Sequence, residues 1–193
     1  QSGQSQEIDV SGDIDNIAGS IQSSSDLKLS AEGALNSTEG QIVSNDRLDL
    51  SAKQLTNDKG TIASNNAAVD IASEQALSTQ QGLIQAATDL TLASQALDNS
   101  KGQILAQTVA MDTAQQALTN TEGKIVGTNL ALQTGALDNS QGLISGTTQV
   151  TVNTHNQGLN NSNTQSSGGV VSQGALSLTS GDLNNATGYI GSK

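Results

Sequence analysis

The chain repeats one short motif at a nearly constant interval along its whole length. A glycine followed two positions later by Ile or Val marks the repeat, and it recurs at Gly19, Gly40, Gly60, Gly82, Gly102, Gly123, Gly142, Gly169 and Gly188. The successive intervals are 21, 20, 22, 20, 21, 19, 27 and 19 residues. A period near twenty residues indicates a repeat protein in which each unit packs on the next.

Each unit also carries the apolar pattern of short strands. A lone Leu or Ile stands five residues before most of the glycines, as Leu97 does before Gly102. A pair of apolar residues separated by one other residue follows seven to nine positions after each glycine, and the pairs include Leu27/Leu29, Leu48/Leu50 and Leu90/Leu92, with Ile8/Val10 leading the series. This alternation is typical of a strand with one buried face. No unit has room for a helix of the usual ~10 residues.

Three strands and their corners within about twenty residues predict one coil of a parallel β-helix. We expect residues 1–193 to form a single all-β domain of about nine coils, cut from a longer protein, and crossover chirality favours right-handed winding. The chain has no Phe, Trp, Cys or Pro and only one Tyr, which suits a narrow interior of stacked aliphatic side chains. Disorder is disfavoured because a disordered chain would not space its Leu and Ile so regularly.

The corner after the lone Leu contains Asn in nearly every unit. Asn tolerates left-handed backbone at a turn, and identical amides on successive coils can form a hydrogen-bonded ladder. The glycine three residues later is expected either to take positive φ or to let neighbouring strands approach closely. The predicted ladder consists of Asn57, Asn99, Asn120, Asn139, Asn161 and Asn185.

The 27-residue interval predicts an inserted corner loop over residues 160–168. Loops on rigid rods are common binding elements, so Asn163 and Gln165 are candidate partner contacts. The residue after the glycine is apolar in three successive units, at Leu143, Val170 and Tyr189, and alternation predicts that it faces outward as an exposed apolar stripe. The alternatives are a tolerated excursion and apolar side chains buried beneath it.

The composition offers little for catalysis or metal binding. The net charge of −11 argues against nucleic-acid binding, and no apolar run approaches the ~18 residues of a membrane helix. His155 is the only His and Arg47 the only Arg, and the nearest carboxylate pairs, Asp13 with Asp15 and Asp46 with Asp49, are expected on a solvated surface. We therefore predict no enzyme activity, no metal site and no cofactor.

The segments "ALDNSQGLIS", "LALQTG" and "LTLAS" resemble the haemagglutinin repeats of filamentous-haemagglutinin-type exoproteins. The resemblance runs from about Ile8 to Ile190. It implies a right-handed parallel β-helix, export from a Gram-negative bacterium through an outer-membrane secretion partner, and a place on the cell surface. The family includes two-partner-secretion adhesins and the long sticks of contact-dependent growth-inhibition toxins, so the resemblance leaves these two roles open.

Taken together, these features predict a rigid stalk segment of a secreted surface protein. Its expected partners are the secretion partner and a protein or glycan receptor on a host cell or neighbouring bacterium. Unpaired strand edges at the two ends of the rod also predict end-to-end self-association. The alternatives are a polysaccharide-degrading β-helix enzyme and a self-transporting passenger domain.

Overall fold

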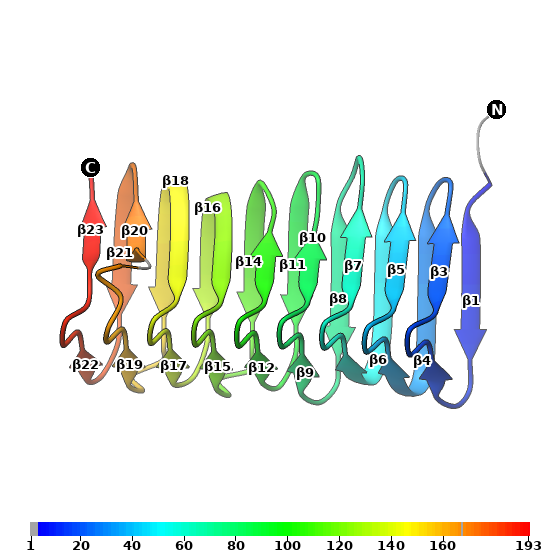
Figure 1. Cartoon of the computed structure of the whole chain (residues 1–193), viewed down its shortest axis with the longest axis horizontal. Coiled ribbons are helices and arrows are strands. Elements are labelled where there is room, and N and C mark those ends of the chain that lie inside the picture. The colour runs from blue at the N-terminus through cyan, green and yellow to red at the C-terminus, as the bar shows by residue number, and fades with distance from the viewer. Residues whose placement is uncertain (1–3, 167) are drawn as a thin grey trace.

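The computed structural model describes residues 4–166 and 168–193, and within them the chain forms 23 strands and no helix. The strands stack side by side along a rod, with the N-terminal strand at one end and the C-terminal strand at the other (Figure 1). Every strand pair within the described residues is parallel, for example β10 with β7 and with β13. The all-β parallel helix of about nine coils is therefore confirmed.

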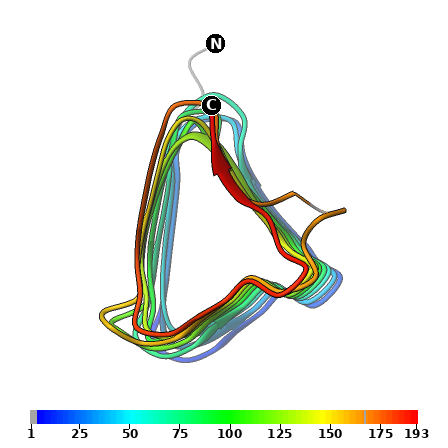
Figure 2. The same ribbon diagram turned by 90° about the vertical axis from the view of Figure 1, so that its left-hand side faces the viewer.

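Each coil passes over three faces, and the cross-section is a triangle (Figure 2). The long face contains β1 (Gln6–Val10), β4 (Leu27–Asn36), β6 (Leu48–Thr56), β8 (Val69–Ser73), β11 (Asp89–Ala93), β14 (Thr108–Asp112) and β21 (Ala175–Thr179). The short face contains β2 (Ile14–Asp15), β9 (Leu77–Ser78), β12 (Leu97–Asp98), β15 (Leu118–Thr119), β17 (Leu137–Asp138), β19 (Leu159–Asn160) and β22 (Leu183–Asn184).

The third face, here called the glycine face, begins just after the repeated glycine. It contains β3 (Ser20–Ser23), β5 (Gln41–Ser44), β7 (Thr61–Ser64), β10 (Leu83–Gln85), β13 (Gln103–Leu105), β20 (Gly169–Ser172) and β23 (Ile190–Ser192). Strands β16 (Lys124–Gln133) and β18 (Leu143–Asn153) run from this face onto the long face, and the ends of β4 and β6 pair on the short face. Viewed from the C-terminal end, the chain winds counter-clockwise as it approaches the viewer, which is right-handed (Figure 2).

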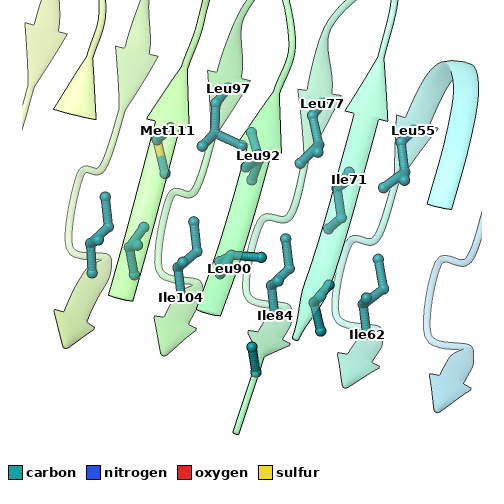
Figure 3. Close-up of a cluster of buried hydrophobic side chains, with 14 of the residues drawn as sticks. Leu55, Ile62, Ile71, Leu77, Ile84, Leu90, Leu92, Leu97, Ile104 and Met111 are labelled. Atoms are coloured by element: carbon teal, nitrogen blue, oxygen red, sulfur yellow. The ribbon is translucent and has the colours of Figure 1, made fainter. Parts of the chain in front are cut away.

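The core consists of columns of equivalent aliphatic side chains. Ile62, Ile84 and Ile104 are direct partners on adjacent coils and are completely buried. Figure 3 shows this column beside the Leu55, Leu77 and Leu97 column of the short face. Burying one such side chain contributes on the order of 1.5–3 kcal/mol. Because every coil contributes the same positions, the rod has one continuous apolar interior without aromatic residues.

The first coil differs from the sequence interpretation in its register. Ile8 is partnered with Leu29 and Gln6 with Leu27, so the leading pair is Gln6 and Ile8. Val10 instead lies beside Ala31. The expectation that Ile8 and Val10 lead the series is therefore wrong by two residues. The inward positions of the strand continue beyond the pair, and Val10 occupies the third of them, which is Ala31 and Ala52 on the next coils.

The corner from the long face to the short face alternates in length. From Leu50 onward, the step from the second residue of the apolar pair on the long face to the short-face Leu is five residues in every second coil and six or seven in the coils between. The seven-residue steps run from Met111 to Leu118 and from Val152 to Leu159. These longer corners project from the cross-section at the lower left of Figure 2.

Gln157, in one of the longer corners, fills the space above the short corner beside it. Its Nε2 donates to the carbonyl oxygen of Gln115 at 3.0 Å, 42 residues away, and its Oε1 accepts the N–H of Ala136 at 3.2 Å. The amide thus replaces the backbone partners that a longer corner at Gly135 would have supplied. Two consecutive coils therefore form a structural pair at this edge of the rod.

Candidate functional site

A ladder of side-chain amides runs inside the corner between the short face and the glycine face. Nδ2 of Asn99 donates to Oδ1 of Asn120 at 2.7 Å, and the same bond joins Asn120 to Asn139, Asn139 to Asn161, and Asn161 to Asn185 at 2.7 to 2.8 Å. The second proton of several amides reaches a backbone oxygen of the next coil, as Asn120 does at Leu143. Asn57, Asn99, Asn120, Asn139 and Asn161 are completely buried.

Two coils interrupt this ladder. Ser37 and Thr79 occupy the Asn position, and their hydroxyl oxygens accept from Asn16 and Asn57 at 3.0 and 3.1 Å. A hydroxyl is too short to extend the chain of bonds, so Oδ1 of Asn57 and Oδ1 of Asn99 are buried without a hydrogen-bond partner in the described part of the chain. An unpaired buried acceptor costs ~1–3 kcal/mol. The ladder is therefore continuous from Asn99 to Asn185 and broken before it.

The backbone strain of the corner lies at a residue that the sequence interpretation did not single out. The residue just before the repeated glycine has positive φ, between 55° and 58° at Glu39, Lys59, Gln81, Lys101, Glu122 and Gln141. The ladder residues of the same corners do not have positive φ. The expectation that the ladder Asn takes left-handed backbone is thus wrong.

The repeated glycine is needed for close approach. A Cβ at Gly102 would lie only 2.3 Å from the carbonyl oxygen of Thr79 on the preceding coil. Gly82 and Gly123 face the equivalent oxygens of Asn57 and Asn99 at the same distance. Any side chain at these positions would force adjacent coils apart, so the glycine is needed because neighbouring strands approach closely. Of the nine glycines, only Gly169 takes positive φ, at 70°.

The inserted loop is shorter than expected. Asn163, with φ of 58°, takes the place of the residue before the glycine, and buried Thr164 takes the place of the glycine itself. The chain returns to the common register at Gly169, which pairs with Leu143. The excursion therefore begins at Gln165 and ends at Gly168, and Ser167 lies outside the described residues. It projects beside the glycine face at the right of Figure 2.

This register corrects the predicted apolar stripe. Val170 pairs with Ile144 and Ile190 and is completely buried in the isoleucine column. The outward position of that coil belongs to Gly169, because the inserted loop shifts the frame by one residue. Leu143 is half-buried on the outer surface, and Tyr189 is 51% exposed. The stripe is thus two apolar side chains separated by a glycine.

The two loop residues named from the sequence contact the last coil. Oδ1 of Asn163 accepts the hydroxyl proton of Thr187 at 2.7 Å, and the backbone N–H of Gln165 donates to the carbonyl oxygen of Thr187 at 3.3 Å. Both side chains are exposed. The structure therefore brings Asn163, Gln165 and Tyr189 to neighbouring coils, while Val170 points into the interior.

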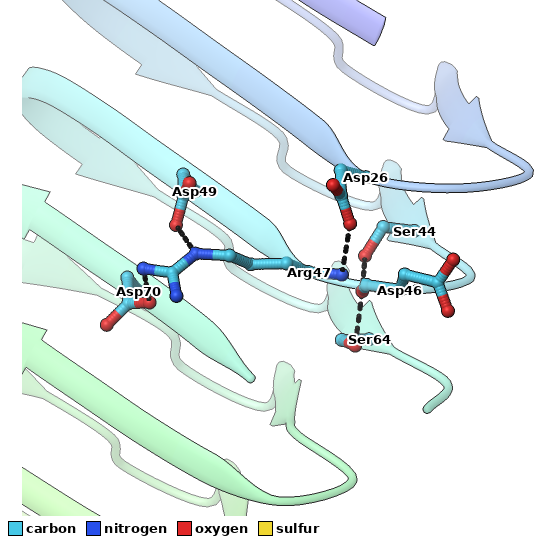
Figure 4. A network of polar contacts seen from close by, with 7 residues as sticks. All are labelled: Asp26, Ser44, Asp46, Arg47, Asp49, Ser64 and Asp70. Carbon is cyan, nitrogen blue, oxygen red and sulfur yellow. Dashed lines mark hydrogen bonds and ion pairs between the residues drawn. The ribbon is translucent and has the colours of Figure 1, made fainter. Parts of the chain in front are cut away.

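Charged side chains concentrate on the long face of the first coils. Arg47 contacts Asp49 at 2.8 Å and Asp70 on the next coil at 2.6 Å, and its backbone N–H donates to Asp26 (Figure 4). These carboxylates raise the pKa of Arg47, with the Asp49 hydrogen bond the largest cause. Lys28 pairs with Glu7 at 2.7 Å, and this bond lowers the pKa of Glu7. Asp26 and Asp70 thus join the coil of Arg47 to the coils on either side, whereas Asp49 lies on the same coil.

The remaining candidate residues have local structural partners. Asp13 accepts the N–H of Ala34 at 2.8 Å, Asp15 accepts that of Ile17 at 3.2 Å, and the carbonyl of Asp46 receives hydroxyl protons from Ser44 and Ser64. His155 is exposed, and its Nδ1 lies 2.9 Å from the carbonyl oxygen of Thr134. Among the described residues, no three His, Cys, Asp or Glu side chains are grouped to hold a metal ion.

These features define the class of protein as a parallel β-solenoid repeat protein. A family model for the haemagglutinin repeat matches residues 3–78, 62–122, 123–158 and 143–193, and the chain belongs to this haemagglutinin repeat family. Comparison with curated proteins and with solved structures returned no significant match. The family is one of structural and adhesin proteins, whose members are typically secreted surface proteins. No helix in the described part of the chain is long and apolar enough to cross a membrane.

Proposed function

We propose that this chain is a stiff spacer in a large secreted bacterial surface protein. The observation that supports it best is the pairing of each coil with the next through parallel backbone bonds, a continuous aliphatic core and the amide ladder. Bending the rod would separate these pairs on one side, so the rod resists bending. Nine coils at ~4.8 Å each place the two ends about 43 Å apart.

In the proposed role the spacer holds a receptor-binding region or a toxin region away from the producing cell. The parent protein leaves the cell through an outer-membrane secretion partner, and its target is a host cell or a neighbouring bacterium. Family membership supports both adhesion and contact-dependent growth inhibition.

Replacing the spacer within the parent protein tests this role. A flexible Gly/Ser segment of equal residue number keeps the chain length but removes the stiffness. We expect cell adhesion, or growth inhibition of neighbouring bacteria, to fall strongly while secretion persists. Full adhesion and full inhibition with the flexible segment would refute the spacer role.

We also propose that the outer surface near the inserted loop contacts a partner. Leu143, Tyr189, Asn163 and Gln165 supply exposed or half-buried side chains on neighbouring coils, and the chain's only aromatic residue is among them. The double variant Leu143→Ser with Tyr189→Ser is expected to weaken cell binding at unchanged stability. Leu83→Ser is the matched control, because Leu83 occupies the same outward position on an earlier coil. Equal cell binding by the double variant and the control would remove this surface from consideration.

A further inference from the structure

The ladder corner contains a second repeated contact, made by the residue just before the ladder Asn. In several coils this residue is Asp or Asn, and its side-chain oxygen accepts the backbone N–H of the residue just after the ladder Asn. Oδ1 of Asp98 accepts the N–H of Ser100 at 2.9 Å, across the ladder residue Asn99. Such a contact is an Asx turn, which directs the N–H toward the preceding side chain. The equivalent bonds join Ser140 to Asp138 at 2.9 Å and Ser162 to Asn160 at 3.2 Å.

The N–H held in this way belongs to the nitrogen that attacks an Asn side chain in deamidation. The backbone nitrogen of Ser100 would lose its proton and form a bond to Cγ of Asn99, while the bond from Cγ to Nδ2 breaks. Nδ2 takes up protons and leaves as ammonia, and the chain is left with a cyclic succinimide. Water then opens the ring to aspartate or isoaspartate. A small following residue favours the reaction, because its side chain does not hinder ring closure.

The acceptor is present where the following residue is small. Serine follows the ladder Asn in three coils, at Ser100, Ser140 and Ser162, and its N–H is bound in all three. By contrast, Asn120 is followed by the bulkier Thr121 and preceded by Thr119, whose side chain makes no such bond within residues 4–166 and 168–193. Asn57 has the same arrangement, between Thr56 and Asp58.

The bond to Asp98 opposes the attack in two ways. Loss of the Ser100 proton would leave a negative nitrogen 2.9 Å from a carboxylate oxygen, so the carboxylate favours the protonated, unreactive form. The bond also holds the peptide group in the Asx turn, so the nitrogen is less free to reach Cγ of Asn99. Both effects act on the reacting nitrogen and not on the ladder amide itself.

Deamidation would break the ladder at the modified coil. Nδ2 of Asn99 donates to Oδ1 of Asn120 at 2.7 Å, and a carboxylate oxygen in place of Nδ2 would put two acceptors face to face. Both residues are completely buried, so the new charge would also be cut off from water. Modification of one amide therefore disrupts the contact between two coils.

We propose that the Asp or Asn just before the ladder residue protects the ladder amide from deamidation. The protected sites are Asn99, Asn139 and Asn161, and the protecting side chains are those of Asp98, Asp138 and Asn160. These side chains are positioning residues, because they act through the backbone nitrogen of the following serine. The inference does not rest on the spacer role, since the reaction takes place within this chain.

Site-resolved mass spectrometry of the folded chain, incubated in mildly alkaline buffer, tests the proposal. The variant is Asp98→Thr, because Thr119 occupies the same position on the next coil and leaves the fold intact. We expect deamidation of Asn99 to accelerate about tenfold or more over the wild type. Asn139 keeps its partner Asp138 and is the internal control, whose rate should change by less than about twofold.

Asp98→Asn separates the hydrogen bond from the size and shape of the side chain. It keeps an acceptor, as Asn160 does for Ser162, so deamidation of Asn99 should stay at least about threefold slower than in Asp98→Thr. An unchanged rate at Asn99 in Asp98→Thr would overturn the proposal. Equal acceleration at Asn99 and Asn139 would assign the effect to loosening of the whole rod and would also overturn it, as would equal rates in the two Asp98 variants.

Discussion

Nδ2 of Asn120 lies 2.7 Å from Oδ1 of Asn139, nineteen residues further along the chain, in a corner from which solvent is excluded. The bond joins equivalent positions of two coils and is repeated from Asn99 to Asn185. The amides of Asn120, Asn139 and Asn161 each accept from the preceding coil and donate to the following one. The bonds fix the register of the corner, because a shift by one residue would leave several buried polar groups unpaired.

The break in this ladder predicts a stabilising substitution. In Thr79→Asn, the new amide can accept from Asn57 and donate to the unpaired Oδ1 of Asn99, as the other ladder residues do. We expect the free energy of unfolding to rise by about 1 kcal/mol, measured by urea denaturation. Thr79→Val is the counterpart: it removes the acceptor of Asn57 and should lower the free energy of unfolding. Destabilisation by Thr79→Asn would show that the ladder has no room for an amide in this coil.

The two residues of the left-handed corner should respond oppositely to substitution. Gln81 has φ of 56°, so Gln81→Gly relieves a conformation that costs a non-glycine residue ~1–2 kcal/mol, partly offset by the greater entropy of the unfolded chain. A small rise in melting temperature is expected. Gly82→Ala places a methyl group 2.3 Å from the carbonyl oxygen of Asn57 and should destabilise by more than about 2 kcal/mol. Similar melting temperatures for the two variants would contradict this assignment.

The Arg47 cluster predicts a salt-dependent effect on stability. Asp49 and Asp70 are direct partners on neighbouring strands, and Arg47 neutralises both. Arg47→Gln removes this cation and leaves the two carboxylates to repel each other. We expect a loss of up to about 1 kcal/mol at low ionic strength, because the side chain is half exposed and solvent screens the pair. The loss should shrink in ~1 M salt. Lys53→Gln, at an exposed lysine that forms no ion pair within residues 4–166 and 168–193, is the control, and an equal loss there would exclude a specific cluster.

The Glu7–Lys28 pair predicts a pH-dependent difference at the first coil. The hydrogen bond from Lys28 lowers the pKa of Glu7 in the folded state, so the pair stabilises above the ordinary glutamate pKa. This contribution is lost as the pH falls through the lowered value. Thermal melts should therefore show a difference between the wild type and Glu7→Gln at about pH 7 that disappears by about pH 2. Glu32→Gln, at an exposed glutamate, should match the wild type at both pH values, and a constant deficit in Glu7→Gln would contradict the ion pair as the cause.

The exposed end of the last coil predicts self-association. Leu183 is 50% exposed there, whereas the equivalent Leu159 is 2% exposed beneath the following coil. Sedimentation at increasing protein concentration should reveal dimers and longer species, because a strand edge and open apolar columns can pair with another copy. Leu183→Lys should shift the distribution toward monomer. Monomer alone at high concentration would contradict the prediction.

The repeat could be read from the sequence because its interior positions are filled so uniformly. The spacing of Ile62, Ile84 and Ile104 was sufficient to place these side chains in one column. The errors arise where alternation gives more than one acceptable frame. At Val170, two adjacent glycines and two adjacent valines fit the motif in either register, and only the partner strands place Val170 opposite Ile144.

The candidate surfaces were less accessible to sequence reasoning. The sequence motif points to the Asn and the Gly of the corner, but the strained residue between them varies in chemical type from Glu39 to Lys101, so no signal identified it. Which corners of the rod project follows from contacts between residues far apart in the sequence, such as Gln157 with Gln115, 42 residues away. The sequence signal for these projecting corners is the alternating number of residues between the apolar pair of the long face and the Leu of the short face.

The bond between Gln157 and Gln115 bears on how such a rod can change in length. A repeat protein can change in length by the deletion or duplication of whole units. Loss of a single coil here would place two short corners or two long corners together and leave the Gln157 amide without its acceptor. Loss of two coils would keep the alternation of short and long corners, so each long corner would again lie next to a short one. Variants that differ by an even number of coils should therefore be the most stable.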